Sequence, residues 1–233
     1  MILDDRLSAA ASMVPQGARL ADIGSDHAYL PIALCLSGQI ECALASDIND
    51  GPVASAIANI QKNGVCDRVR AIKADGLWGA KDFCPDCITV LGMGGELIVS
   101  ILDAAPWIKN KGITLVLQPM THPEILAEYL ASSGCETVDE KMVCDGGRSD
   151  RIYRIIRAKY TGEPRQIDEI DAIVGRINLR RADSATVAYV KRLIRVYEAR
   201  VCGKKSSGRD ASDEERLVSE LKREIGEKEN ESC

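Results

Sequence analysis

The chain has 233 residues, 45% of them apolar, 28% charged and only 4% aromatic, and its net charge is −5. Its length allows one large domain, or one domain with an appendage, around a core of aliphatic side chains. The charge argues against a uniformly basic nucleic-acid-binding protein, and no apolar run is as long as a membrane span. The N-terminus is acidic where a signal peptide is basic, so we expect a cytoplasmic protein.

Short apolar runs alternate with stretches of helical length through the first two thirds of the chain. The apolar runs predict strands at 18–23, 41–46, 68–74, 87–92 and 112–118. The intervening segments predict helices at 28–38, 51–64, 94–108 and 122–134, several of which end in glycine. This alternation indicates an α/β fold with a parallel sheet covered by helices on both faces.

The pattern changes after the fifth strand. Residues 135–144 and 148–160 predict two more strands separated by the turn signal DGGR, which would form an antiparallel end to the sheet. A break at 161–166 interrupts the pattern. We therefore divide the chain into a domain at 1–160 and a helical region at 161–233.

The helical region has an uneven charge distribution. Residues 176–209 contain ten Lys or Arg side chains but only two acids, Asp183 and Glu198. The segments 181–203 and 213–229 predict two helices that pair antiparallel, because neither is apolar enough to be stable alone. A solvated helix face is the simplest explanation of such a charge run, but the imbalance favours RNA binding.

Nine cysteines are scattered along the chain, and their odd number argues against a disulfide framework. We expect them to be reduced, several as small core residues. Cys84 and Cys87 have the spacing of a zinc-binding pair, but no second pair follows. Structural zinc needs four ligands, so we expect no metal site.

The first predicted strand leads into the sequence Gly24-Ser25-Asp26-His27-Ala28-Tyr29. Open α/β sheets bind ligands at this end of their strands. A dinucleotide site would prefer G-x-G-x-x-G, because a pyrophosphate needs close approach to the backbone. Here there is one glycine and an added carboxylate, which would repel a pyrophosphate but attract a sulfonium and an ammonium group. The loop therefore favours S-adenosylmethionine over NAD.

The next strands end in groups that suit the same ligand. Asp47 follows the second strand, where a carboxylate accepts hydrogen bonds from ribose hydroxyls in NAD sites as well. Asp75 and Gly76 follow the third strand and suit an adenine edge, and the turn Gly92–Gly95 follows the fourth. Each group has an ordinary alternative as a cap or a tight turn, but four at successive strand ends indicate a ligand site.

Taken together, these motifs resemble one family. They are ARLADIGSDHAYLPIAL, ASDINDGPVASAIANI, ADGL, ITVLGMGGELI, LVLQPM and the R-x-Y-x-I-I sequence that begins at Arg151. The combination is similar to the bacterial tRNA (adenine-N1)-methyltransferases that act on adenine 22, the TrmK family, over essentially the whole chain. The turn at Gly92–Gly95 stands where enzymes that methylate exocyclic amines have N/D-P-P-Y, which argues against N6 methylation.

The resemblance implies a Rossmann-like methyltransferase fold with a mostly parallel seven-stranded sheet and a C-terminal helical, coiled-coil-like appendage. It implies S-adenosyl-L-methionine as cofactor and 1-methyladenosine in the tRNA D-arm as product. The implied cofactor-binding residues are Asp22, Gly24, Ser25, Asp26, His27, Asp47, Ile48, Asp75, Gly76, Gly92, Met93 and Gly94.

The chemistry of adenine N1 suggests roles for residues near the loop. N1 has an in-plane lone pair and needs no strong base, so the enzyme has to align it and stabilise positive charge. We expect Asp26 or His27 to do so or to accept the amine proton, with an imidazole the better acceptor near neutral pH. Tyr29 is expected either to stack on a base turned out of the RNA or to pack in the core.

Other residues are expected to help from their positions. Gln118, at the end of the fifth strand, is placed to bond the base, and Arg6 to reach the cofactor or a phosphate. The basic side chains of the helical region would bind phosphates along the tRNA backbone. These are Arg176, Arg180, Arg181, Lys191, Arg192, Arg195, Arg200, Lys204 and Lys205.

The hypothesis from sequence is therefore an S-adenosylmethionine-dependent tRNA methyltransferase that binds tRNA through residues 176–209, with its oligomeric state open. One alternative is a methyltransferase for a small molecule or protein, which would need no basic region. A second is a non-catalytic RNA-binding protein that retains a cofactor pocket. An NAD-dependent enzyme is disfavoured by the single-glycine loop.

Overall fold

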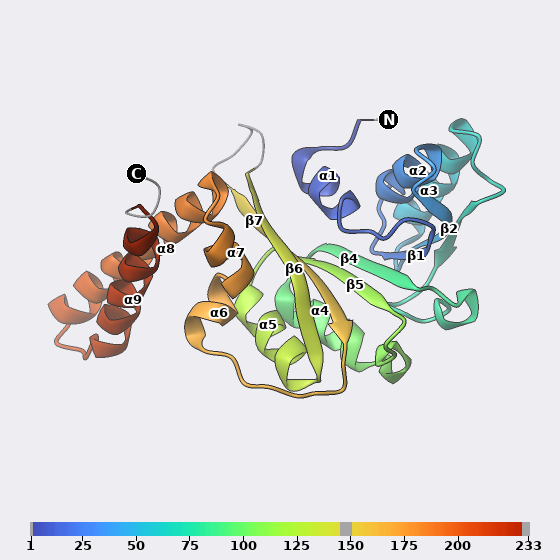
Figure 1. The fold of residues 1–233 in the computed structure, drawn as a ribbon. Helices are drawn as coiled ribbons and strands as arrows, with labels where there is room; N and C mark the ends of the chain where they lie inside the picture. The colour runs from blue at the N-terminus through green and yellow to red at the C-terminus, as the bar shows by residue number, and fades with distance from the viewer. Residues whose placement is uncertain (1, 145–150, 230–233) are drawn as a thin grey trace.

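The structure, a computed structural model, describes residues 2–144 and 151–229. Within these residues a seven-stranded sheet has the order β3-β2-β1-β4-β5-β7-β6 (Figure 1). Strands β1 to β5 are parallel, and β7 is antiparallel to both β5 and β6. The strands are β1 Ala18–Ile23, β2 Ile40–Asp47, β3 Val69–Lys73, β4 Cys87–Met93, β5 Thr114–Pro119, β6 Cys135–Cys144 and β7 Ile152–Tyr160. The predicted mostly parallel sheet with an antiparallel end is confirmed.

Helices cover both faces of the sheet (Figure 1). One buried cluster joins α1 and α2 to side chains such as Leu20, and the other joins α4 and α5 to side chains such as Ala21. Adjacent residues of β1 thus face opposite cores, as the alternation of a strand requires. The helices are α1 Asp5–Ala11, α2 Tyr29–Leu36, α3 Asp50–Lys62, α4 Gly95–Asp103, α5 Pro123–Ser132, α6 Glu169–Ile173, α7 Arg176–Arg181, α8 Ser184–Ser206 and α9 Ser212–Glu229, with single 3₁₀ turns η1 Lys81–Phe83 and η2 Pro106–Ile108.

Two departures from the predicted elements have local causes. The helix expected at 94–108 ends at Asp103, and Ala105 leaves the helical region because Pro106 follows it. Helix α1 was not predicted. Its N-cap Asp4 accepts a hydrogen bond from the backbone N–H of Leu7 at 2.7 Å, which satisfies a free donor of the first turn.

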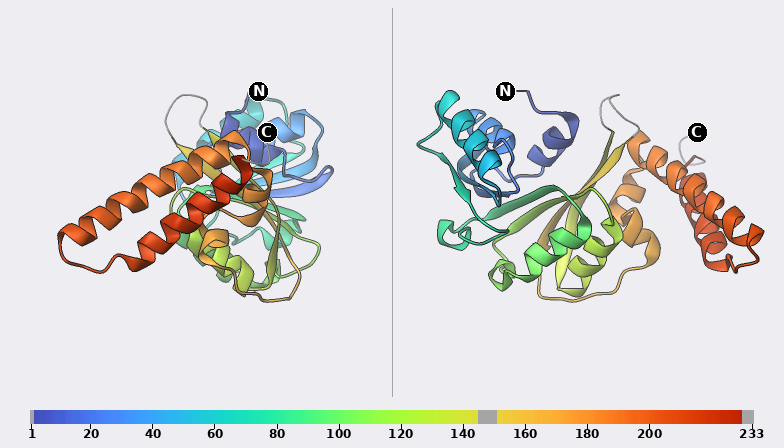
Figure 2. Two further views of the ribbon diagram at one scale, coloured as in Figure 1. Left: turned by 60° about the vertical axis from the view of Figure 1, so that its left-hand side comes forward. Right: turned by 180° about the vertical axis from the view of Figure 1, so that it is seen from behind.

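The C-terminal helices form a separate layer beside the antiparallel end of the sheet. Helices α8 and α9 lie side by side and project away from it, as the two views of Figure 2 show. Their apolar stripes meet in a third cluster that includes Val190, Ile194 and Leu221 and extends to Met142 on β6. The predicted antiparallel helical pair is therefore present, and it packs on the sheet.

A buried ion pair joins this layer to the sheet. Arg154 on β7 donates from Nε and Nη2 to one carboxylate oxygen of Glu140 on β6, at 3.0 and 2.7 Å. The other oxygen of Glu140 accepts the backbone N–H groups of Ile177 and Asn178 at the start of α7. Both charged side chains are at most 3% exposed. Gly175 lies against the same carboxylate, where a β-carbon would collide with it.

Several other expectations concern single features. Cys35, Cys87 and Cys135 are buried, as expected for small core residues, and the cysteines of the described residues are unpaired. The turn predicted at DGGR lies outside the described residues. Over 2–144 and 151–229, no helix has both the length and the apolar character of a membrane span.

Candidate active site

The predicted site residues gather at the carboxyl edge of the parallel strands. Strands β1 and β4 are neighbours in the sheet, and the chain order reverses between them, which is where open α/β sheets form a ligand crevice. The groups that follow β1, β2, β3 and β4 therefore lie along one edge, in the order that the sheet dictates.

A cavity of about 290 Å³ lies over the loop after β1. The loop turns at Gly24, whose φ of 73° is unfavourable for other residues, and the N–H groups of Gly24 and Ser25 both donate to the carbonyl of Ser46 on β2. The cavity is lined by three carboxylates, one guanidinium, one imidazole and one phenol. These belong to Asp4, Asp22, Asp26, Arg6, His27 and Tyr29.

Asp22 is the buried carboxylate of this cavity, and it is 6% exposed. Burial raises its pKa, while hydrogen bonds from Ser25 and Thr89 and the charge of Arg6 oppose that rise. The hydroxyl of Thr89 donates to Oδ1 of Asp22 at 2.6 Å. The protein thus places a desolvated carboxylate at the end of β1, an arrangement that favours binding of a cation.

The polar part of the loop forms a cluster beside it. Nε2 of His27 lies 3.2 Å from Oδ2 of Asp26, and both side chains are partly exposed to solvent. The ring of Tyr29 stacks on the imidazole of His27, with centroids 5.0 Å apart and planes at 26°. Tyr29 is 43% exposed, so it does not pack in the core. Of the two expectations for Tyr29, the structure therefore favours the exposed ring.

Gln118 has a different environment from the one predicted. It is fully buried, and its Oε1 accepts hydrogen bonds from Nη1 of Arg6 at 3.0 Å and from the N–H of Gly92 at 3.1 Å. Its Nε2 donates to the carbonyl of Pro119. The prediction that Gln118 hydrogen-bonds a base directly is therefore wrong. Gln118 instead orients Arg6, which α1 places at the cavity beside Asp22.

The residues after β2 and β3 extend the site along the edge of the sheet. Oδ1 of Asp47 accepts from the N–H of Asn49, and Ile48 is 55% exposed at the rim. Asp75 and Gly76 line a second cavity of about 410 Å³, which also contains the side chains of both tryptophans, Trp78 and Trp107. Because β2 lies between β1 and β3 in the sheet, Asp47 at the end of β2 lies between the ends of those two strands.

The glycine turn after β4 brings two parts of the backbone close together. A β-carbon at Gly95 would collide with the backbone carbonyl of His122, and Gly94 is the N-cap of α4. Gly92 has a φ of 78°, and the terminal methyl of Met93 lies against Gly24. The glycines therefore let β4, the β1 loop and the β5–α5 connection meet at one point.

Comparison with known proteins agrees with this geometry. Residues 3–156 match a family model described as a methyltransferase domain. The Bacillus subtilis protein tRNA (adenine(22)-N(1))-methyltransferase is 34% identical over 175 residues, which are 75% of this chain and 72% of that protein. The chain belongs to the tRNA (adenine(22)-N(1))-methyltransferase family.

Solved structures of two relatives have the same fold over nearly the whole chain. The B. subtilis m1A22 tRNA methyltransferase TrmK has a TM-score of 0.80 at 27% identity, covering 97% of this chain and 96% of that one. The Streptococcus pneumoniae protein Sp1610 was crystallised in complex with S-adenosyl-L-methionine. It has a TM-score of 0.82 at 28% identity, covering 94% of this chain and 99% of that one. The likeness includes the C-terminal helices.

The residues of this chain fit S-adenosylmethionine. The cofactor has a sulfonium, an ammonium and a carboxylate, and the first cavity has three carboxylates for the cations and Arg6 for the anion. The hydroxyl oxygen of Ser46 is buried beside the Gly24 loop with no partner in the described part of the chain. A buried polar atom without a partner at this position is consistent with a ligand site. Among the described residues, no cluster of His, Cys, Asp or Glu suits a metal ion.

The basic segment 176–209 is less available than its composition indicates. Arg176 pairs with Asp168 and Glu224, and Arg181 pairs with Asp139. Lys204 and Lys205 pair with Glu214 and Glu215 of α9. The pairs with Glu214, Glu215 and Glu224 join α9 to α8 and α7, and the pair with Asp139 joins α7 to β6. Arg180, Arg195 and Arg200 are exposed and form no ion pair with the described part of the chain.

Two features of this site were not predicted from the sequence. The buried hydrogen bond from Thr89 to Asp22 joins β4 to β1, and no local motif marks it. The second feature is helix α1: Arg6 was expected to reach the cofactor or a phosphate, but the helix that carries it was not predicted. The sequence Asp4-Asp5-Arg6-Leu7 contains an N-cap signal that predicts the helix.

Proposed function

We propose that the protein transfers a methyl group from S-adenosylmethionine to N1 of adenine 22 in tRNA. The proposal rests on the 34% identity to the B. subtilis enzyme of that activity, together with the acidic cavity at the β1 loop. Incubation with unmodified tRNA and S-adenosylmethionine, followed by mass spectrometry of the nucleosides, is expected to show 1-methyladenosine. Methylation of the protein preparation or of small molecules with no tRNA product would favour the rival methyltransferase.

The cofactor would lie across the two cavities. Its methionine part would meet Asp22, Arg6 and the Gly24 loop, with Met93 and Gly94 beside it, and its ribose would meet Asp47. Its adenine would lie against Ile48 and the pair Asp75-Gly76. When bound, this cofactor supplies an electrophilic methyl group on a positively charged sulfur. Asp22 and Asp26 would stabilise that charge before transfer.

The acceptor adenine would enter beside His27 and Tyr29. An unpaired base stacks readily on an aromatic ring, and the exposed ring of Tyr29 is available for this at the mouth of the first cavity. The product carries positive charge on the base, and the carboxylate of Asp26, which lines the first cavity, would stabilise that charge. His27, held by Asp26, would accept the proton that the exocyclic amine then loses.

Replacing His27 with asparagine is expected to lower kcat by about 100-fold, the usual contribution of a positioned proton acceptor. The KM for S-adenosylmethionine should change little, because the amide can still bond Asp26. Initial rates of 1-methyladenosine formation at varied S-adenosylmethionine concentration measure both effects. His122→Asn is the matched control, since this other histidine of the chain is exposed and paired with Glu124. An unchanged kcat for the His27 variant would remove this residue from the mechanism.

We also propose that residues 161–233 bind the tRNA while residues 1–160 hold the reaction. Support comes from the exposed cations Arg180, Arg195 and Arg200, which form no ion pair with the described part of the chain. Such contacts to phosphates give affinity that falls with salt. The ion pairs of the described residues narrow the proposed RNA surface to the cations of the basic segment that form none with α9.

A further inference from the structure

A third cavity, of about 480 Å³, lies where the helical layer meets the sheet. Its walls come from three separate parts of the chain, the end of β5, the start of β7 and one side of α8. The lining side chains that matter here are Met120, Tyr153, Tyr189, Arg192, Leu193 and Val196. The volume is within the ordinary range for a small-ligand site, about 300–1,000 Å³.

This cavity adjoins the proposed active site. Arg6 lines the first cavity, and its guanidinium carbon lies 6.0 Å from the ring centroid of Tyr153, which lines the third. Gln118, which holds Arg6, also approaches the sulfur of Met120 at 3.4 Å. Arg6 and Gln118 thus link the wall of the first cavity to Tyr153 and Met120 in the wall of the third.

The walls have the chemistry of a nucleobase site. The chain has only one Phe, two Trp and six Tyr, yet two tyrosine rings line this cavity. Met120 and Val196 are 40% and 41% exposed, so apolar surface of both walls is accessible to a ligand. Aromatic rings, apolar walls and an arginine are the groups on which unpaired bases stack in RNA-binding proteins.

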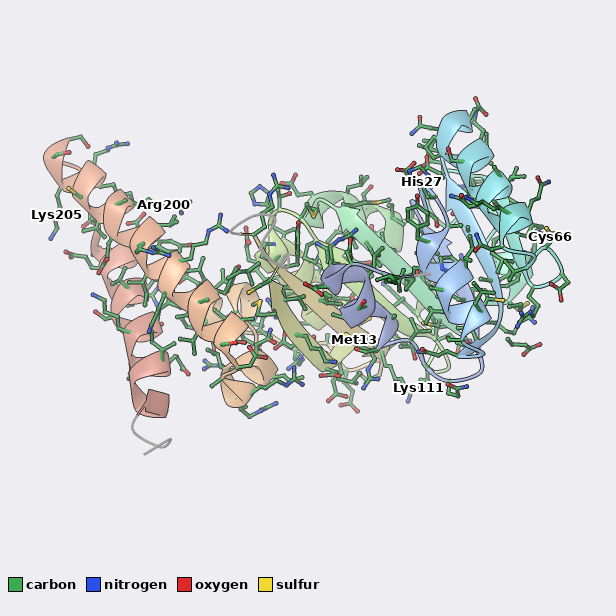
Figure 3. All side chains as sticks on the ribbon, turned by 90° about the horizontal axis from the view of Figure 1, so that it is seen from above. Met13, His27, Cys66, Lys111, Arg200 and Lys205 are labelled. Atoms are coloured by element: carbon green, nitrogen blue, oxygen red, sulfur yellow. The ribbon has the colours of Figure 1, made fainter. Side chains whose placement is uncertain are left out.

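The opening of the cavity continues into an arginine row on α8. Arg192, Val196 and Arg200 are spaced four residues apart, so they lie on one side of the helix. Arg195 is exposed on the adjacent turn. Seen from above, α1 lies between α2 and α8, with His27 on one side of it and Arg200 on the other (Figure 3). A polyanion that follows α8 would therefore reach the third cavity first and the His27 side after it.

We propose that this third cavity binds one nucleotide of the tRNA next to the target adenosine, with its base against Tyr153 and Tyr189 and its phosphate near Arg192. This proposal rests on the proposed function, because it takes the RNA as substrate. The site would give the helical layer a role in recognising one nucleotide, beyond the general attraction of its cations for phosphates. By holding a neighbouring nucleotide out of the stack, the cavity fixes which adenosine enters the first cavity.

The test is a binding cycle that needs no turnover. The Kd is measured for intact tRNA and for tRNAs that lack the base at one position on either side of the target, with the unaltered protein and with Tyr153→Leu. At one of these positions, loss of the base should weaken binding to the unaltered protein about tenfold, the effect of one lost stacking contact. The Tyr153→Leu protein should bind intact tRNA more weakly by a similar factor, and loss of that base should not weaken its binding further. Equal responses of both proteins at every position would overturn the proposal.

Two further variants control for folding and for charge. Val196→Glu places a carboxylate at an exposed position of the cavity mouth and should also remove the response to that base. Arg195→Gln, on the same helix but outside the cavity, should weaken binding through salt-sensitive charge alone and keep the response. Formation of 1-methyladenosine by the unaltered protein separates the two claims. If 1-methyladenosine forms but Tyr153→Leu and the unaltered protein respond equally to the missing base, only the proposed nucleotide site is wrong. If the protein binds no tRNA, both claims fail.

Discussion

Replacing Asp22 with asparagine is expected to weaken S-adenosylmethionine binding about 10- to 100-fold and to make the ligand-free protein more stable. The loss follows from removing a buried charge that faces a cationic ligand, at about 1.5–3 kcal/mol for a charged hydrogen bond. The gain in stability follows from burial, which penalises the ionised form of Asp22 and therefore raises its pKa. Calorimetric titration measures the affinity, and thermal unfolding measures the stability.

The pH dependence of stability shows whether the ionised Asp22 carboxylate destabilises the folded protein. The native pKa of Asp22 is raised above its ordinary value of 3.8. Such a group contributes its full stability below the unfolded pKa, and that contribution is lost as pH rises through the native pKa. The difference in stability between Asp22→Asn and the unaltered protein should therefore be small near pH 3.8 and should grow in favour of the variant above it.

The matched control is Asp67→Asn, the same change at an exposed carboxylate remote from the cavity. It should alter neither cofactor affinity nor the pH dependence of unfolding. If Asp22→Asn bound S-adenosylmethionine as tightly as the unaltered protein, the carboxylate would have no part in cofactor binding. If the variant were less stable at neutral pH, the burial argument would be wrong.

Replacing Glu140 with alanine is expected to destabilise the protein by about 3–5 kcal/mol, the cost of leaving a buried charge without its partner. Arg154 would remain buried, and the first N–H groups of α7 would lose their acceptor. The helical layer would then detach from β6 and β7, so binding of tRNA should fall with stability. Urea unfolding followed by circular dichroism measures the free energy of unfolding.

Glu136→Ala is the control on the same strand, because Glu136 is exposed and should change stability by no more than about 0.5 kcal/mol. The double variant Glu140→Ala with Arg154→Ala should cost less than the sum of the single changes, since it leaves no unpaired charge. Additive losses would show that the two side chains do not act as a pair.

The sheet was predictable because a parallel strand buried on both faces is a continuous apolar run. The runs at Ala18–Ile23 and Cys87–Met93 are found almost to the residue. The order of site groups followed from the same pattern, since each lies at the end of one strand. Helix α1 was missed because seven residues are too few to show a period, and the N-cap Asp4 was the signal available.

Side-chain environments were less predictable than positions. Gln118 has the correct place at the end of β5, but its amide is used within the protein by Arg6 and Gly92, which are distant in sequence. The charge of the basic segment was likewise interpreted without knowing which acidic side chains pair with it. Lys204 and Lys205 lie in the last turn of α8, where α9 brings Glu214 and Glu215 back to them. Pairings of this kind depend on the tertiary fold.

The most direct test of the central claim is methylation of a tRNA transcript at a single position. The protein and S-adenosylmethionine are incubated with an unmodified transcript and with the same transcript carrying guanosine in place of adenosine 22. The account predicts 1-methyladenosine in the first transcript and none in the second. Methylation of both transcripts, or of neither by a folded protein that binds S-adenosylmethionine, would contradict it.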